Sequence, residues 1–131
     1  MTGGSEITVL ALGGLLVVAQ YVLMAVPANL QLGPAVTTGP RDTPLALTGV
    51  AGRLHRALGN MHEALLLYAV AAVSVTLLDA TSGLTAVCAW VWFGARVAYV
   101  PCYALGLSPW RSIAFVIGFG AATLMLIAAL V

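Results

Sequence analysis

The fold of this chain is decided by residues 53–78, which read RLHRALGNMHEALLLYAVAAVSVTLL. The apolar run from Ala64 to Leu78 holds fifteen residues, which reach about 22 Å as a helix. That length falls short of a bilayer core about 30 Å thick. The segment crosses a membrane only if its helix extends back through Glu63 and Asn60 towards Arg56. The sequence therefore predicts a helix that carries polar side chains at membrane depth.

The composition indicates a membrane protein. Of the 131 residues, 62% are hydrophobic and 7% are charged, whereas a soluble domain averages about 45–50% apolar and about 25% charged residues. Such a chain cannot maintain a water-facing surface, which excludes a soluble enzyme, a nucleic-acid-binding protein and a disordered linker. The formal net charge is only +1, so no basic or acidic tail is present. Cys88 and Cys102 indicate neither a disulfide framework nor a zinc or redox pair.

Three further segments are long and apolar enough to cross a membrane. They cover residues 7–26, 84–105 and 110–131, each close to the roughly 20 residues that a spanning helix requires. We predict an all-α membrane protein with one domain, residues 1–131, and four helices at approximately 6–27, 53–78, 84–105 and 109–131. Four of the six prolines fall between residues 27 and 44, so residues 28–52 are predicted to form the main loop. Ser108 is placed to cap the last helix, with Pro109 at its first position.

The arginines predict the orientation of the bundle. With four spans, loop 28–52 and turn 106–109 share one face, and both termini share the other face with turn 79–83. All five arginines lie on or towards the first face, namely Arg41, Arg53, Arg56, Arg96 and Arg111. Because cytoplasmic loops carry an excess of positive residues, we expect loop 28–52 to lie in the cytoplasm and both termini outside.

Arg96 is the arginine that topology alone does not explain. It lies about 13 Å along the third predicted helix from the cytoplasmic end. A charge at this depth normally faces a protein interior, a partner charge or a water-filled cavity. The alternative is a side chain that extends back towards the lipid headgroups. Tyr99 and Tyr103 follow Arg96 at three and seven positions, which places all three on one stripe of the helix.

The second predicted helix also has a polar face. At 100° per residue, an arc of about 80° holds four polar side chains, namely Arg53, Arg56, Asn60 and Glu63. His55 and His62 point roughly the opposite way. Unpartnered polar groups that face lipid cost several kcal/mol, so this face is expected to meet protein or ligand. The structural alternative is an internal ion pair between Glu63 and an arginine of the third helix. Such a pair would account for one arginine and leave the others without a partner.

Arg111 and Ser112 stand in the first turn of the fourth predicted helix. The helix dipole is positive there, so a cation is mildly unfavourable unless an anion binds. An arginine beside helix N-terminal amides is a candidate anion-binding corner. Together, the three polar helices predict a cationic cavity that opens to the cytoplasm and is walled by apolar helices. Such a cavity suits a reaction between a small polar anion and an apolar partner from the bilayer.

At these residues the sequence resembles a known family. Residues 56–63, RALGNMHE, fit the R-A-x-x-N-x-x-E signature of membrane-associated proteins in eicosanoid and glutathione metabolism, the MAPEG family. Residues 96–103 and 109–112 resemble the third and fourth helices of that family, and residues 39–42 and 47–49 resemble its bacterial members. The resemblance extends from about Ile7 to Val131. The chain differs from many glutathione-using relatives at Gly59, where they often carry a basic residue, and at Tyr99, where some have histidine.

The resemblance implies a subunit of a homotrimer in a bacterial inner membrane, with glutathione bound between subunits near the cytoplasmic face. By position, glutathione would be held by Arg53, Arg56, Asn60 and Glu63 and, from the third helix, by Arg96, Tyr99 and Tyr103. Arg111 and Ser112 would lie nearest the sulfur and act in catalysis. The implied function is a glutathione-dependent transferase or peroxidase that acts on a lipophilic small molecule dissolved in membrane lipid.

The chemistry of these residues agrees with that function. A thiol of pKa about 8.5 is mostly protonated at neutral pH, and a nearby cation raises its thiolate fraction. Arg111 supplies such a charge, and the Ser112 hydroxyl can donate to the sulfur. No metal is required, and two histidines seven residues apart are a weak metal signal. Two other functions are open: a non-catalytic subunit of the same fold that binds lipid or a partner protein, and a proton-coupled exporter, which would place its carboxylate near mid-membrane among few cations.

Overall fold

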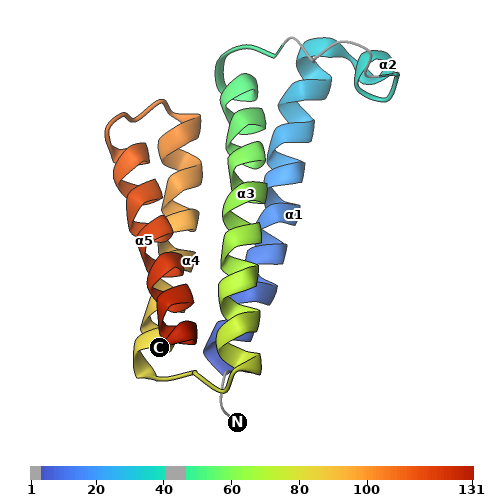
Figure 1. The fold of residues 1–131 in the computed structure, drawn as a ribbon. Helices are drawn as coiled ribbons and strands as arrows, with labels where there is room; N and C mark the ends of the chain where they lie inside the picture. Colours follow the sequence, from blue (N-terminus) through green and yellow to red (C-terminus); the bar gives the residue numbers. More distant parts are fainter. Residues whose placement is uncertain (1–3, 41–46) are drawn as a thin grey trace.

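The computed structural model describes residues 4–40 and 47–131, which form four long helices and a short one (Figure 1). The long helices are α1 (Gly4–Leu32), α3 (Gly49–Leu77), α4 (Gly83–Ala104) and α5 (Trp110–Leu130), and the short one is α2 (Pro34–Thr37). Each long helix is long and apolar enough to cross a membrane, and the described residues contain no strand. The chain is an all-α, multi-pass membrane protein, as the sequence predicted.

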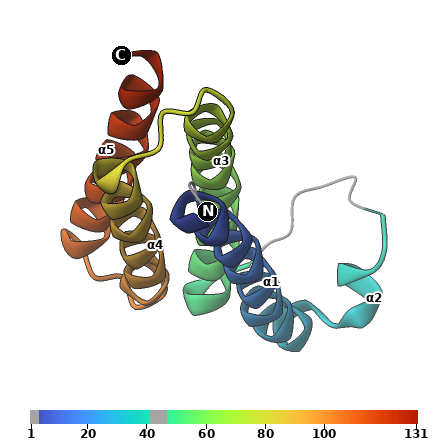
Figure 2. The ribbon, with the colours of Figure 1, turned by 90° about the horizontal axis from the view of Figure 1, so that it is seen from below.

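The four long helices pack as two pairs that are joined mainly through α3. α1 lies along α3, and α4 lies along α5, while α3 also contacts α4 and α5 (Figures 1 and 2). The start of α1, the end of α5 and the α3–α4 turn lie at one end of the bundle (Figure 1). α2 and the α4–α5 turn lie at the opposite end, which we call the loop end. Which end faces the cytoplasm stays a prediction.

α1 and α3 both extend beyond their predicted limits. α1 continues through Pro27 instead of ending there, because membrane helices tolerate the loss of one backbone hydrogen bond at a proline. The helix ends at Leu32, and the following Gly33 has a φ of 84°, a left-handed conformation that glycine adopts without a Cβ clash. The Gly33 amide donates to the Asn29 carbonyl at 2.8 Å. α3 begins at Gly49 instead of residue 53, so the connection is shorter than residues 28–52.

A stacked aromatic pair lies at the centre of the core. The ring centroids of Tyr68 on α3 and Trp92 on α4 are 4.2 Å apart, and both side chains are buried. The surrounding core is built mostly from alanine, valine and methionine, namely Val9, Met61, Ala71, Ala72, Val75, Ala89, Ala122 and Met125. Small side chains allow the helix backbones to approach closely, as is usual in membrane bundles.

Glu6 is buried at the end of the bundle opposite the loop end. Its carboxylate accepts a hydrogen bond from the Thr85 hydroxyl at 2.5 Å, and its carbonyl accepts one from the Tyr68 hydroxyl at 2.8 Å. Thr85 also completes a capping box with Ser82 at the start of α4. These bonds fix the start of α1 against α3 and α4.

A valine in place of Gly13 is expected to destabilise the bundle. A Cβ at Gly13 would lie 2.9 Å from Leu65 Cδ1 and 3.3 Å from the Trp92 ring, so the Leu65 side chain and the buried Trp92 ring would both have to shift. Overpacking of this kind costs roughly 1–3 kcal/mol. Gly14 is the matched control, because a Cβ there meets nothing within 4 Å. Thermal unfolding in detergent should give Gly13→Val a lower Tm than Gly14→Val, and equal values would contradict the packing.

Candidate functional site

Tyr103 connects residues of three helices near the loop end. Its hydroxyl accepts a hydrogen bond from Arg56 Nε on α3 at 3.3 Å, across 47 positions of sequence. The guanidinium carbon of Arg111, in the first turn of α5, lies 4.9 Å from the Tyr103 ring centroid. This separation is within the range of a cation–π interaction. The fold therefore brings together three residues that the sequence predicted for one site.

Tyr99 extends this cluster deeper into the bundle. Its ring centroid is 5.5 Å from that of Tyr103, and the guanidinium carbon of Arg96 lies 4.1 Å from the Tyr99 centroid. The Arg96 side chain is only 2% exposed, so it lies inside the bundle and does not extend to the headgroups. Arg96 Nε and Nη2 have no hydrogen-bond partner in the described part of the chain. Burying a donor without a partner costs free energy. A ligand that accepted hydrogen bonds from these two groups would remove that cost.

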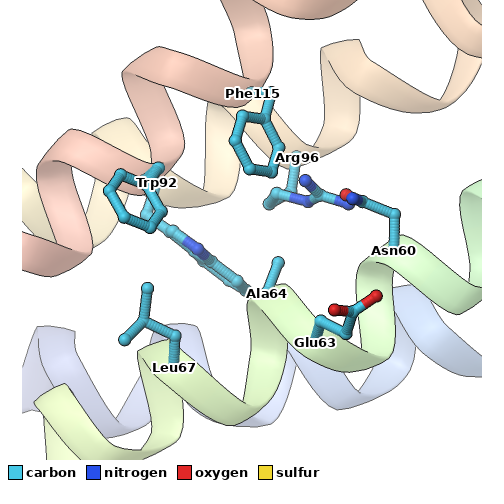
Figure 3. A pocket seen from close by; sticks show the side chains of 8 residues that line it. Asn60, Glu63, Ala64, Leu67, Trp92, Arg96 and Phe115 are labelled. Atoms are coloured by element: carbon cyan, nitrogen blue, oxygen red, sulfur yellow. The ribbon is translucent and has the colours of Figure 1, made fainter.

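A cavity of about 180 Å³ lies between α3, α4 and α5 (Figure 3). The Asn60 amide and the Arg96 guanidinium point towards each other at one end of it (Figure 3). Asn60 Oδ1 is buried and has no hydrogen-bond partner among residues 4–40 and 47–131. The remaining wall is formed by Glu63, Ala64, Leu67, Trp92, Phe115 and Phe119. The cavity therefore has a polar end and an aromatic, apolar end.

A second cavity of about 270 Å³ adjoins the first. It is lined by Asn60, Tyr99, Arg111, Ser112, Phe115 and Val116. Asn60 and Phe115 line both cavities, so the two lie side by side, and we call them together the cationic site. Six of the nine predicted site residues line it, namely Asn60, Glu63, Arg96, Tyr99, Arg111 and Ser112. Arg56 and Tyr103 join it through the contacts described above.

The arginines of the cationic site are not neutralised within the described chain. Glu63 lines the site but forms no ion pair with any residue that the structure describes, so the internal pair with the third span is absent there. Arg56, Arg96 and Arg111 likewise lack a carboxylate partner in these ranges. A cluster of cations with one carboxylate nearby is complementary to a ligand that is predominantly anionic.

Arg53 lies apart from both cavities. Its Nη1 donates a hydrogen bond to the carbonyl of Ala104, the last residue of α4, at 3.2 Å. A cation is favourable at this place because the C-terminal end of a helix dipole is negative. Arg53 therefore attaches the end of α4 to α3. Arg41, which the charge pattern assigned to the same end, lies outside the described residues.

The start of α5 differs from the prediction. The helix begins at Trp110, Pro109 occupies the cap position, and no side chain provides a capping hydrogen bond, so the predicted Ser108 cap is wrong. The Arg111 amide already donates to the Leu107 carbonyl at 3.0 Å, because the preceding turn folds back onto the helix start. That amide is not free for an anion, and Arg111 contributes to the site through its side chain.

Three aromatic residues of the site were not singled out from the sequence. Phe115 and Phe119 follow Arg111 at four and eight positions, and Trp92 precedes Arg96 by four. These helical spacings place each aromatic on the same face as an arginine. Spacing alone does not distinguish an aromatic that lines a cavity from one that faces lipid, so the packing of the helices was needed to find them.

The two histidines lie on the other side of α3. His55 and His62 line a separate cavity and neither part of the cationic site. Among the described residues, no group of three or more histidine, cysteine or acidic side chains is placed to hold a metal ion. The cationic site is lined by arginine, tyrosine, amide, hydroxyl and aromatic groups and by the Glu63 carboxylate.

Four helices long and apolar enough to span a membrane, with a cationic site beside arginines from three of them, define a helical membrane protein with a cavity complementary to an anion. The chain matches the MAPEG family model over residues 9–131 and belongs to that family. Its members are membrane proteins of eicosanoid and glutathione metabolism. The match confirms the resemblance seen at residues 56–63. Neither a curated protein nor a solved structure matches the chain.

Replacing Arg96 with methionine is expected to stabilise the ligand-free protein. Methionine fills a similar volume and removes a buried cation without a carboxylate partner. Even a buried ion pair can be replaced by hydrophobic residues of similar volume with no loss or with a gain of about 1–4 kcal/mol, and a cation without a carboxylate partner has less attraction to lose. Arg53→Met is the control, and it should lower the Tm because Arg53 donates to Ala104. A Tm for Arg96→Met far below that of the wild type in detergent would show that another group satisfies the guanidinium.

Proposed function

We propose that this chain is a glutathione-dependent transferase or peroxidase that acts on lipophilic electrophiles or peroxides in the membrane. The observation that carries the proposal is the Tyr99–Tyr103 pair, which contacts three arginines from three helices. None of these arginines is paired with a carboxylate in the described chain. Glutathione is a small anion that carries a thiol, and membership of the MAPEG family supports it as the ligand.

Glutathione offers two carboxylates, one ammonium group and two amides to the site. We assign its carboxylates to Arg56 and Arg96, whose guanidinium groups contact Tyr103 and Tyr99 respectively. The unpartnered Asn60 Oδ1 can accept from an amide N–H. The Glu63 carboxylate, in the wall of the same cavity, can accept from the ammonium group. In this assignment Arg53 supports the site indirectly, by holding α4 against α3.

The thiol of glutathione is assigned to the second cavity, beside Arg111 and Ser112. The Arg111 charge favours the thiolate, and the Ser112 hydroxyl donates to the sulfur. The thiolate attacks an electrophilic carbon, a sulfur–carbon bond forms, and the leaving group departs with its bonding electrons. With a peroxide, the thiolate attacks one oxygen, the O–O bond breaks, and the alkoxide takes up a proton. A second glutathione then reduces the sulfenic acid, which gives a disulfide and water.

The lipophilic partner is proposed to enter from the bilayer. Trp92, Phe115 and Phe119 form the aromatic wall of the cationic site. Phe119 and Val116 are also exposed on the outer surface of α5, where lipid would surround the protein. A molecule dissolved in membrane lipid can therefore reach the aromatic end of the site without passing through water, while glutathione enters from the polar end.

We further propose a homotrimer in a bacterial inner membrane, with the loop end in the cytoplasm. In the single chain, Arg56 and Glu63 are exposed on one face of α3. Charged groups at membrane depth require a protein partner or a water-filled cavity. Neighbouring subunits that cover this face would satisfy that requirement and enclose the cationic site.

The trimer is tested by native mass spectrometry in mild detergent. The expected result is a species of three chains that persists when lipid is removed, because the polar face of α3 is then still covered by protein. A stable monomer or dimer as the main species would contradict this assembly, without bearing on glutathione binding by the chain.

Alanine at Arg56 and alanine at Arg111 are expected to have different effects. Arg56→Ala removes a group that holds glutathione, so binding should weaken by roughly 1.5–3 kcal/mol, the contribution of a hydrogen bond to a charged group. Loss of an interaction made equally in the ground and transition states raises KM and leaves kcat unchanged. Arg111→Ala should instead lower the thiolate fraction of bound glutathione, and with it kcat at neutral pH.

The pH dependence has a definite sign. Loss of a cation raises the thiol pKa, so the deficit of Arg111→Ala must shrink as pH rises towards the thiol pKa of about 8.5. Thiolate absorbance and turnover of an aryl halide, measured between about pH 6 and pH 9, follow this change. A shifted profile in Arg56→Ala, or an unshifted one in Arg111→Ala, would reverse the assigned roles. Glutathione binding without any thiolate would instead indicate the non-catalytic subunit.

A further inference from the structure

A third cavity lies between α1, α2 and α3, on the face of α3 opposite the cationic site. Its volume is about 490 Å³, within the range of roughly 300–1,000 Å³ that small-molecule sites occupy. It shares no lining residue with the cationic site. α2, which contributes to its wall, lies on the side of the bundle away from α4 and α5 (Figure 2). The two sites are therefore separated by the body of α3.

The described residues contribute hydroxyl, amide and imidazole groups to this third cavity. Tyr21, His55 and His62 contribute a phenol and two imidazoles, and no arginine or acidic residue is among the described side chains that line it. None of these three has a hydrogen-bond partner in the described chain. The Tyr21 and His62 rings lie 5.5 Å apart at an interplanar angle of 50°. Met24 and Leu58 add apolar surface.

These observations limit the chemistry of a ligand. Among the described residues that line this cavity, a carboxylate or phosphate would meet no arginine and an ammonium group would meet no carboxylate, so neither charge would be compensated there. The phenol and imidazole groups, which are exposed in the single chain and have no partner among the described residues, favour a molecule with hydrogen-bonding oxygens. A neutral imidazole has one donor and one acceptor nitrogen, so it can bind either a carbonyl or a hydroxyl.

We propose that the third cavity binds a neutral, ring-bearing lipophile with oxygen atoms on opposite sides of its ring, the chemistry of a quinone or quinol headgroup. His55 and His62 are seven residues apart, which corresponds to about 10 Å along the helix axis. Two hydrogen bonds of about 2.9 Å, on either side of a ring whose oxygens are about 5 Å apart, cover that distance. The ring lies against Tyr21 and His62, and the apolar remainder lies against Met24 and Leu58.

Gly59 keeps this cavity open. It lines the cavity, and a Cβ at this position would meet nothing within 4 Å. A larger side chain at Gly59 therefore fills the cavity without displacing a neighbour. The site does not depend on the proposed glutathione chemistry, because none of its residues belongs to the cationic site.

The histidine content of the chain provides a direct test. Since the chain has two histidines, protein labelled with isotopic nitrogen at histidine alone gives NMR imidazole signals only from His55 and His62. Decylbenzoquinone, titrated into the protein in detergent, is expected to shift both signals in a saturable manner. Decylbenzene, which has the ring and tail but no oxygens, should produce no saturable shift. Glutathione should leave both signals unchanged.

Two variants sharpen the test. His55→Phe removes one of the two proposed hydrogen bonds and keeps a ring, so the affinity for decylbenzoquinone, read from the His62 signal, should fall about fivefold to tenfold. Gly59→Leu should abolish the shifts while its Tm and glutathione binding stay near those of the wild type. The proposal is overturned if decylbenzoquinone gives no saturable shift, if decylbenzene gives the same shift, or if Gly59→Leu binds normally. Saturable quinone shifts in a protein that does not bind glutathione would contradict only the proposed function.

Discussion

A charged group within the membrane must meet a partner, and this requirement governs the loop end of the bundle. Among the arginines of the cationic site, Arg96 has the strongest need for a partner, because it is 2% exposed and has no carboxylate partner in the described chain. The Tyr99 ring face offsets part of its charge. Tyr103 does the same for Arg111 and accepts a hydrogen bond from Arg56. Contacts between α3, α4 and α5 at this end therefore hold three cations close together and leave donors available to an anion.

The opposite half of the bundle has a different composition and a different role. There the Tyr68–Trp92 stack, the alanine-rich core and the buried Glu6–Thr85 hydrogen bond hold the helices together without an arginine. Trp92 belongs to both halves, because it stacks on Tyr68 and also lines the cationic site. The packing of the core therefore fixes the position of Trp92 in the aromatic wall of the site.

The two faces of α3 carry different kinds of polar side chain. Its one face carries Arg56, Asn60 and Glu63 towards α4 and α5, and its other face carries His55 and His62 towards α1 and α2. Because the arginines and the imidazoles are on opposite sides of the helix, each cavity presents one kind of chemistry. The cationic site is complementary to an anionic ligand, whereas the third cavity is proposed to bind an uncharged one.

The sequence by itself determined the number of spans, the polar face of the second long helix and most of the residues that meet in the cationic site. Hydropathy and helical periodicity are local properties, so a single segment reveals them. Tertiary structure alone decided that Arg53 binds the end of α4, that Glu63 has no ion pair in the described chain, and that Trp92 and Phe115 wall the site. These outcomes depend on the rotation and depth of each helix against its neighbours. Both are determined by contacts between residues that are distant in the chain, which no local pattern contains.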